Sequence, residues 1–420
     1  MITKVNHLFS IIVLIITFLI PSIILASDNV LATQKKLNEL GFNAGAADGI
    51  WGNTTKNALI EYLSTKGLKF DGALDNNEFK LLDITIKRCS AKPHKRTGLK
   101  LASTWSQEIK CPAEVFVASD LRASTKSTIE ATLDAAAAEW GNYGPVEYWV
   151  MGADKAAALE LVKKYCQRRA KRNDQGNSGC IDRETGSNGS YGLMYYWKIG
   201  ADALSSRNSR LDAGHNGGFG WGMHNFSSSL PLGLENKLGM SGADDQKVIM
   251  HEYFHAVQHA QIRQLDLQKR DKLKGPVWFM EGGAEYMASA GYAKLISNKK
   301  LKRNKNGRNK YDFRNSMKWT FEQAKKDNYR HDCVSKMATI SHGGTCGSFW
   351  YDGGTWAIAY LLNQTDQNIL LSTFYPNLVK LGWEGAFQKS FQKSSDAFYL
   401  EFAEFLKKSP GNAMRIIPRY

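Results

Sequence analysis

Two histidines and a glutamate within five residues have the types and the spacing for metal-assisted hydrolysis. They form the string His251-Glu252-Tyr253-Phe254-His255. Residues four apart lie on one face of a helix, so His251 and His255 can both reach one metal ion. Glu252 lies one step round the same turn, where its carboxylate can take a proton from a water molecule on that ion. By composition alone such a match occurs in about one chain in a hundred of this length, so two surface histidines on an ordinary helix are the alternative.

A helix of about residues 244–265 must position these side chains. Its start is predicted at Ser241-Gly242-Ala243-Asp244, where a hydroxyl and a carboxylate lie three residues apart. Val248, Ile249 and Val257 give the helix an apolar side for the core, while the histidines point elsewhere. Successive turns of one helix cannot all converge on a tetrahedral ion. A further ligand must therefore come from another element.

A second string resembles the second zinc helix of the gluzincin metallopeptidases, in which Glu-Gly-x-Ala follows a tryptophan. It reads Trp278-Phe279-Met280-Glu281-Gly282-Gly283-Ala284-Glu285, on a predicted helix of about residues 277–290. The resemblance implies a His₂Glu zinc site in which Glu281 is the third ligand and one position stays open for water. It also implies that Glu285, one turn later, orients a zinc-bound histidine. The two glutamates could exchange these roles, and a pair of exposed helix carboxylates is the alternative.

One string upstream resembles part of the aminopeptidase branch of the gluzincins. Gly220-Trp221-Gly222-Met223-His224-Asn225 matches its Gly-x-Met-Glu-Asn string, except that His224 replaces the glutamate. In that branch the glutamate binds the free amino terminus of the substrate, which an imidazole cannot do. We therefore expect an endopeptidase in preference to an aminopeptidase, with His224 and Asn225 in the substrate cleft. A strand histidine without a substrate role is the alternative.

Two other features bear on which branch of the zinc metallopeptidases this chain resembles. Tyr351-Asp352-Gly353-Gly354 matches a Tyr-x-x-Gly string of the aminopeptidase branch. The resemblance implies that the Tyr351 phenol stabilises the tetrahedral intermediate, a contribution of roughly a few kcal/mol; ordinary packing at a helix start is the alternative. The metzincins have glycine and histidine three and six residues after the second histidine, where this chain has Gln258 and Gln261. The metzincin branch is therefore excluded.

The order of elements predicts an α+β domain from residue 111 to about 410, which the resemblance makes a gluzincin-like metallopeptidase domain. Apolar, β-branched and aromatic runs predict strands at Glu114–Ala118, Val146–Val150, Leu193–Trp197 and about 220–225. Periodicity predicts helices at Ser127–Trp140 and Ala156–Arg172, with a loop over 174–192. A mostly helical C-terminal part should bury the phenylalanines that recur at helical spacing, Phe391, Phe398, Phe402 and Phe405.

Residues 29–84 form a separate small module with regular glycine punctuation. Its characteristic strings are Leu40-Gly41-Phe42, Asp48-Gly49, Trp51-Gly52 and Gly67-Leu68. Over the whole module they resemble the three-helix peptidoglycan-binding domain, which implies attachment to a bacterial cell wall. Asp48-Gly49 and Gly52 allow the tight turns that bring helices together. Trp51 is either a partly buried anchor or a platform for a sugar or peptide stem of the wall.

The first 26 residues predict export. Lys4 precedes an almost wholly apolar run from Leu8 to Ile20, Pro21 then breaks the helix, and Ala26 offers a small residue before a cut. A retained membrane anchor is the alternative, because the run is nearly long enough to span a bilayer. After cleavage we expect no membrane span and a protein in the periplasm or outside the cell.

The six cysteines fit structural disulfides in an oxidising compartment. Pairing nearest neighbours gives 89–111, 166–180 and 333–346, one of fifteen possible connectivities. Cys89 lies in a predicted linker, residues 85–110, in a string that faintly resembles the cysteine switch of matrix metallopeptidases. A disulfide to Cys111 is the preferred interpretation.

The formal net charge of +15 bears on possible partners. Basic residues cluster in Lys163–Arg172 and Lys294–Lys318, which fit either solvated segments or attraction to an anionic polymer of the cell envelope. No aromatic-interleaved basic motif supports nucleic acid binding. The sequence therefore predicts an exported zinc metallopeptidase, targeted to the cell wall, that acts on a protein or peptide. The alternatives are a peptidoglycan hydrolase that cuts wall peptides and a non-catalytic wall-binding protein with a structural or vestigial metal site.

Overall fold

The chain divides into two compact units, Met1–Phe70 with Leu81–Ile84 and Asp71–Lys80 with Thr85–Tyr420. The computed structural model describes residues 28–49, 51–70, 74, 76–83, 112–143, 145–171, 177–186, 192–206, 212–215, 224–229, 245–262, 267–303, 312–341 and 344–420. The predicted signal peptide, the linker and the 89–111 cysteine pair lie outside these residues. Among the helices in these ranges, none combines the length and the apolar character needed to cross a membrane.

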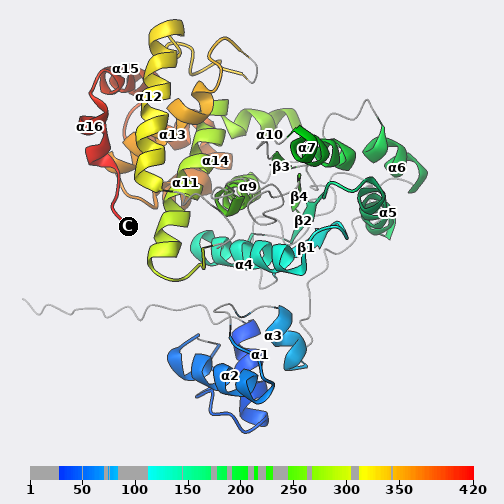
Figure 1. The fold of residues 1–420 in the computed structure, drawn as a ribbon. Coiled ribbons are helices and arrows are strands. Elements are labelled where there is room, and N and C mark those ends of the chain that lie inside the picture. The colour runs from blue at the N-terminus through cyan, green and yellow to red at the C-terminus, as the bar shows by residue number, and fades with distance from the viewer. Residues whose placement is uncertain are drawn as a thin grey trace, which may run out of the picture. The chain divides into compact units, whose positions relative to one another are not determined.

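The described part of residues 28–83 forms the three helices predicted for the N-terminal module: α1 (Asp28–Glu39), α2 (Asn53–Thr65) and α3 (Asn76–Leu81), most of which is grouped with the second unit (Figure 1). Gly49 has a φ of +76°, a left-handed conformation that favours glycine. Its N–H donates to the Gln34 side chain at 2.7 Å, and the Gln34 amide donates to Asp48 at 2.9 Å and to Thr55 at 3.0 Å. Asp48 and Gly49, which belong to the characteristic strings, therefore fix the conformation of the loop between α1 and α2 through Gln34.

The described strands of the second unit form one sheet in the order β1 (Glu114–Val117), β2 (Val146–Val150), β4 (His224–Ser228), β3 (Ala213–His215). The first three are parallel, and β3 runs antiparallel to β4 at the edge. Every residue of β2 is buried, as expected of a parallel strand covered on both faces. Tyr148 packs with α4 (Ala123–Trp140) and α9 (Asp245–Ala260), whereas Trp149 packs with α5 (Lys155–Lys171).

Two local predictions on the α5 side of the sheet are wrong. Leu193–Trp197, predicted as a strand, begins the helix α7 (Leu193–Ser206). Its aromatic residues favour strands locally, but packing of one helical face outweighs that preference. The buried residues of α7 recur three or four apart and are Leu193, Tyr196, Ile199, Gly200 and Ala203. Within the predicted loop 174–192, residues Asn177–Thr185 form α6, which a disulfide joins to α5.

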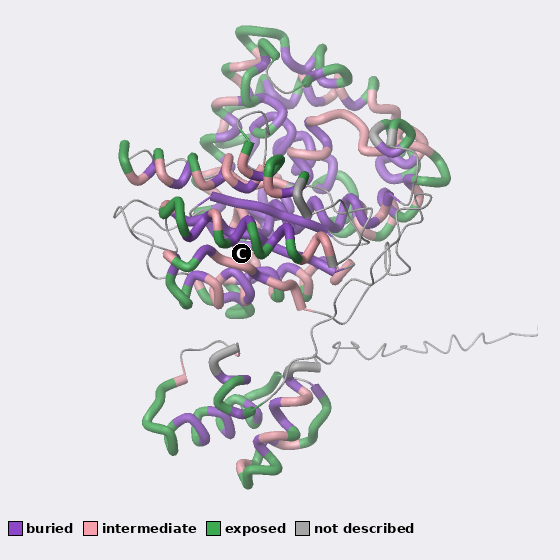
Figure 2. The backbone as a smooth tube through the Cα atoms, turned by 90° about the vertical axis from the view of Figure 1, so that its right-hand side faces the viewer, coloured by how far each residue is buried: buried purple, intermediate pink, exposed green. Residues whose placement is uncertain are grey.

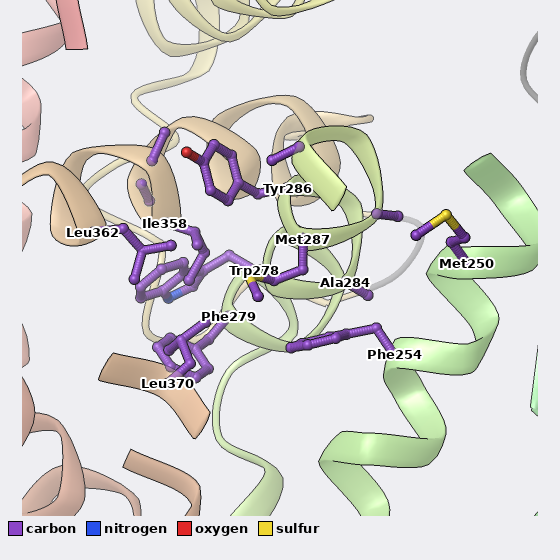
Figure 3. Packing of buried hydrophobic residues seen from close by; sticks show 14 of the residues in the cluster. Met250, Phe254, Trp278, Phe279, Ala284, Tyr286, Met287, Ile358, Leu362 and Leu370 are labelled. Carbon is purple, nitrogen blue, oxygen red and sulfur yellow. The ribbon is translucent and has the colours of Figure 1, made fainter. Parts of the chain in front are cut away.

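The rest of the described chain is helical. Its elements are α10 (Leu267–Lys274), α11 (Val277–Ser297), α12 (Phe313–His331), α13 (Phe349–Gln364), η2 (Leu370–Phe374), α14 (Tyr375–Phe391), α15 (Ser395–Leu406), α16 (Pro410–Ala413) and η3 (Met414–Ile416). Helix α11 lies between α9 and α13, with Phe254 on one side of it and Ile358 on the other (Figure 3). Buried residues form a continuous interior in this unit, and exposed residues lie on the outer turns (Figure 2). The tail phenylalanines are buried, as predicted.

Two of the three predicted disulfides lie in the described chain, and both pairings are confirmed. Cys166–Cys180 joins α5 to α6, with 5.7 Å between the Cα atoms. Cys333–Cys346 closes the segment between α12 and α13, with 5.6 Å between the Cα atoms. In the chain-entropy model a closed loop of about 15 residues adds about 3 kcal/mol of stability. The second disulfide also fixes the start of α13, where Tyr351 lies.

Candidate functional site

Helices α9 and α11 bring His251, His255 and Glu281 together as a group that could hold a metal ion. The two Nε2 atoms are 3.1 Å apart, and each lies 3.5 Å from Glu281 Oε2. Around a tetrahedral zinc ion with bonds of about 2.0 to 2.1 Å, neighbouring ligand atoms are about 3.3 to 3.4 Å apart. The three side chains therefore fit one small ion without rearrangement.

A close crossing of α11 and α13 positions the ligand-bearing turn. A Cβ atom added to Gly282 would lie 2.2 Å from the Gly354 carbonyl carbon, and one added to Gly354 would lie 2.5 Å from the Trp278 carbonyl oxygen. Only glycine permits so close an approach of two backbones. Gly282 follows Glu281, and Gly354 lies three residues after Tyr351. The crossing therefore brings Tyr351 beside the ligand group from a segment distant in the sequence.

Tyr351 lies in the first turn of α13 and is 38% exposed. Its ring centroid is 6.3 Å from that of His251, and its phenol hydrogen-bonds Glu281. Burial raises the pKa of Tyr351, and the charges of Glu281 and Glu252 raise it further. The phenol therefore keeps its proton near neutral pH and can donate a hydrogen bond to developing negative charge.

Glu285 contacts His251. Its Oε2 lies 3.1 Å from His251 Nδ1, and its Oε1 accepts from Lys247 Nζ at 2.5 Å. Burial would raise the pKa of Glu285, but the charge of Lys247 and the contact with His251 hold that pKa well below its usual range. An ionised Glu285 accepts from the Nδ1–H group and leaves Nε2 for a metal. The orienting role that the resemblance implies for Glu285 stays a prediction, with this contact as its basis.

Gln258 contacts the second histidine, a role that the sequence reasoning missed. Its Oε1 lies 2.7 Å from His255 Nδ1. The signal was present, because residues three apart on a helix are neighbours. From the sequence alone, Gln258 served only to exclude the metzincins.

Glu252 is buried beside the ligand group, with 6% of its surface exposed. Burial raises its pKa; the charges of His251 and His255 oppose the rise, and that of Glu281 adds to it. A raised pKa suits a carboxylate that accepts a proton and returns it near neutral pH.

The structure buries both residues that were predicted to line the substrate cleft. His224 is 0% exposed, and burial together with the charge of Arg270 lowers its pKa to about 3. Asn225 is 1% exposed and donates to the Tyr165 hydroxyl at 2.9 Å, on the α5 face of the sheet. Their strand, β4, is internal rather than at the edge. Neither side chain reaches the surface, so their contact with substrate stays a prediction.

Part of the first basic cluster is paired within the fold. Arg168 forms ion pairs with Glu114 and Glu147, and Arg169 lies 3.4 Å from Glu184. This cluster therefore offers less charge to an anionic polymer than its formal charge indicates. Residues 304–311 of the second cluster lie outside the described residues.

The Trp51 ring lies at the surface of the N-terminal module. It is 38% exposed and packs at 6.1 Å from the Phe70 ring. Residues 26–82 match the family model described as "Putative peptidoglycan binding domain". The N-terminal module is a peptidoglycan-binding domain. This domain and the two disulfides indicate an extracytoplasmic, wall-associated protein.

No curated protein and no solved structure matches the chain significantly. The match to the peptidoglycan-binding domain ends at residue 82, so it does not cover the metal-ligand group. What that group can do therefore follows from its own geometry.

Proposed function

We propose that this protein is a zinc-dependent metallopeptidase of the gluzincin type, exported and targeted to the cell wall by its peptidoglycan-binding domain. The observation that carries the proposal is the spacing of His251 Nε2, His255 Nε2 and Glu281 Oε2, which suits one zinc ion. Two histidines and the base Glu252 come from one helix and the glutamate ligand from another, the division expected of this type.

The residues around the group divide the chemistry of peptide hydrolysis. A bound zinc ion would polarise the scissile carbonyl and lower the pKa of water. Glu252 accepts the proton of the attacking water and passes it to the leaving amine. Tyr351 donates a hydrogen bond to the oxyanion that develops on the carbonyl oxygen. Glu285 and Gln258 hold the two imidazoles with Nε2 toward the centre.

The edge strand supports a peptide as the substrate. In the described chain β3 forms the edge of the sheet and contacts α9, which carries both histidines. The backbone groups of an edge strand can pair with an extended peptide. Ala213 carries only a methyl group and Gly214 has no side chain, so neither would obstruct a peptide along this strand.

Zinc content and hydrolysis, measured on wild type and Glu252→Gln, test the proposal. The substrates are internally quenched peptides with an acetylated or a free amino terminus. Both are needed because His224 is buried, so its replacement of the glutamate no longer decides between an endopeptidase and an aminopeptidase. We expect one zinc per chain in both proteins and hydrolysis slower by about 10² to 10⁴-fold in the variant. Glu322→Gln, an exposed glutamate on α12, is the matched control. A zinc-loaded Glu252→Gln variant as fast as wild type contradicts the mechanism, and cleavage only of unblocked peptides identifies an aminopeptidase.

The peptidoglycan-binding domain favours a second candidate, a hydrolase that cuts the peptides of the wall itself. Such a domain holds the enzyme at high local concentration beside wall peptides. Incubation with purified wall and, separately, with an unfolded protein distinguishes the two candidates. Release of wall fragments without cleavage of the unfolded protein would show that the substrates are wall peptides and not proteins.

A further inference from the structure

The two histidines of the centre are held by different chemical groups. His251 faces the carboxylate of Glu285, which also accepts from Lys247. His255 faces a neutral amide, that of Gln258, which is 0% exposed. A buried amide that contacts a ligand must be satisfied on all sides, so its other partners determine which way it points.

Those partners fix the orientation of the amide. Gln258 Nε2 donates to the Met280 carbonyl oxygen at 3.0 Å and to the Tyr375 hydroxyl at 3.1 Å. A backbone carbonyl can only accept, so the NH₂ group must face Met280 and the oxygen must face His255. An amide oxygen can only accept a hydrogen bond, so the donor in the contact with His255 is the imidazole. His255 must therefore carry its proton on Nδ1, which leaves the lone pair of Nε2 directed at the centre.

The same amide joins the two ligand-bearing helices. Gln258 belongs to α9, and Met280 is the residue before the ligand Glu281 on α11. Gly283 makes room for the connection, because a Cβ atom there would lie 3.2 Å from Gln258 Nε2. The second glycine of the Glu-Gly-Gly string therefore has a purpose distinct from that of Gly282, which contacts α13.

We propose that Gln258 is a positioning residue that selects the Nδ1–H tautomer of His255 and ties this ligand to the backbone beside Glu281. The inference rests on the proposed function, since it assigns the tautomer by its use in holding zinc. Gln258 does not touch the reacting atoms; it acts through His255. Because its side chain is neutral, Gln258 can orient His255 without a charged partner, whereas a carboxylate in its place would need a cation beside it, as Glu285 has in Lys247.

Zinc affinity, measured by competition with a chelator, tests the proposal independently of activity. The variants are Gln258→Met, which keeps the volume and removes every hydrogen bond, and Gln258→Glu, which keeps an acceptor for His255. Gln261→Met, the same change one turn later in the chain, is the matched control. We expect zinc affinity to fall by about 10- to 100-fold in Gln258→Met, to fall less in Gln258→Glu and to stay unchanged in Gln261→Met. The visible spectrum of the cobalt-substituted proteins should change in the same order.

The outcomes separate this inference from the proposed function. If wild type binds zinc and Gln258→Met binds it equally well, the positioning role is wrong while the metallopeptidase stands. If Gln258→Glu loses as much affinity as Gln258→Met, an acceptor does not select the tautomer and the inference is overturned. Wild type that binds no zinc removes the proposed function itself. Should Gln258→Met fail to fold, Gly283→Ala displaces the amide without deleting it, and unchanged zinc affinity there also overturns the inference.

Discussion

The two units of the chain carry their functional residues in opposite ways. In the peptidoglycan-binding domain the characteristic residues are spread along the module, and contacts such as Gln34 with Thr55 link neighbouring segments. In the second unit the candidate centre draws on α9, α11 and α13, with Tyr351 one hundred residues after His251. The residues typical of the wall-binding domain therefore follow a local sequence pattern, whereas the candidate metal centre depends on the packing of helices that are distant in the sequence.

This difference predicts that the two functions can be separated. A change at the centre should leave wall binding intact, and a change on the surface of the N-terminal domain should leave peptide hydrolysis intact. Both the N-terminal domain and the second unit contain buried apolar residues, such as Leu37 and Leu59 in the first and Phe254 and Trp278 in the second. Of the four changes below, the first and the last test this separation, and the other two test how helix packing positions the candidate centre.

Replacement of His255 by alanine should have the largest effect. It removes one of the three proposed ligands and leaves the Glu281 carboxylate without one of the groups that stabilise its charge. We expect zinc to be lost and hydrolysis of the quenched peptide to fall to background, while sedimentation with purified wall is unchanged. Loss of wall binding in a folded His255→Ala variant would break the separation.

Tyr351→Phe should have the next largest effect. The phenol donates a hydrogen bond and coordinates no metal in the proposed site, so zinc content should stay at the wild-type value. Loss of one oxyanion donor typically lowers kcat by about 10² to 10³-fold with little change in KM. Steady-state kinetics on zinc-loaded protein check this. An unchanged kcat would reduce Tyr351 to a packing residue at the start of α13.

Gly282→Ala should have a smaller effect, on stability and activity together. The added methyl group would lie 2.2 Å from the Gly354 carbonyl carbon, so α11 and α13 must move apart. Overpacking of this kind costs about 1 to 3 kcal/mol in the free energy of unfolding, which urea titration measures. Gly411→Ala, where an added Cβ meets nothing within 4 Å, is the control. A variant as stable and as active as wild type would show that the crossing does not position Tyr351.

The sequence predicted elements well where local pattern determines them. The parallel strands β1 and β2, the helices α4 and α5 and the buried tail phenylalanines were predicted within a few residues. The prediction failed at Leu193–Trp197, where the aromatic run favoured a strand but packing against α5 selected a helix. It also could not place β3 at the edge of the sheet, because strand order depends on long-range pairing.

The candidate site follows the same division. His251 and His255 were predicted to share a helical face, and their Nε2 atoms lie 3.1 Å apart. The assignment of Glu281 needed the resemblance to a family, because spacing alone does not say which helices meet. The bond from Gln258 to the Met280 carbonyl and the contact of Gly282 with Gly354 could not be predicted. Both depend on the distance between two packed backbones, which no local pattern encodes.

Trp51→Ala should have the smallest effect, confined to wall binding. The ring is 38% exposed and packs on Phe70, so its loss removes a contact surface without opening the core of the module. Aromatic contacts contribute about 0.5 to 1.5 kcal/mol each, so we expect binding to purified wall to weaken by roughly two- to tenfold, with peptide hydrolysis unchanged. Trp319→Ala, which removes a 57% exposed tryptophan from the second unit, is the control and should leave wall binding unchanged. Equal losses in the two variants would show that both units contact the wall and that the separation does not hold.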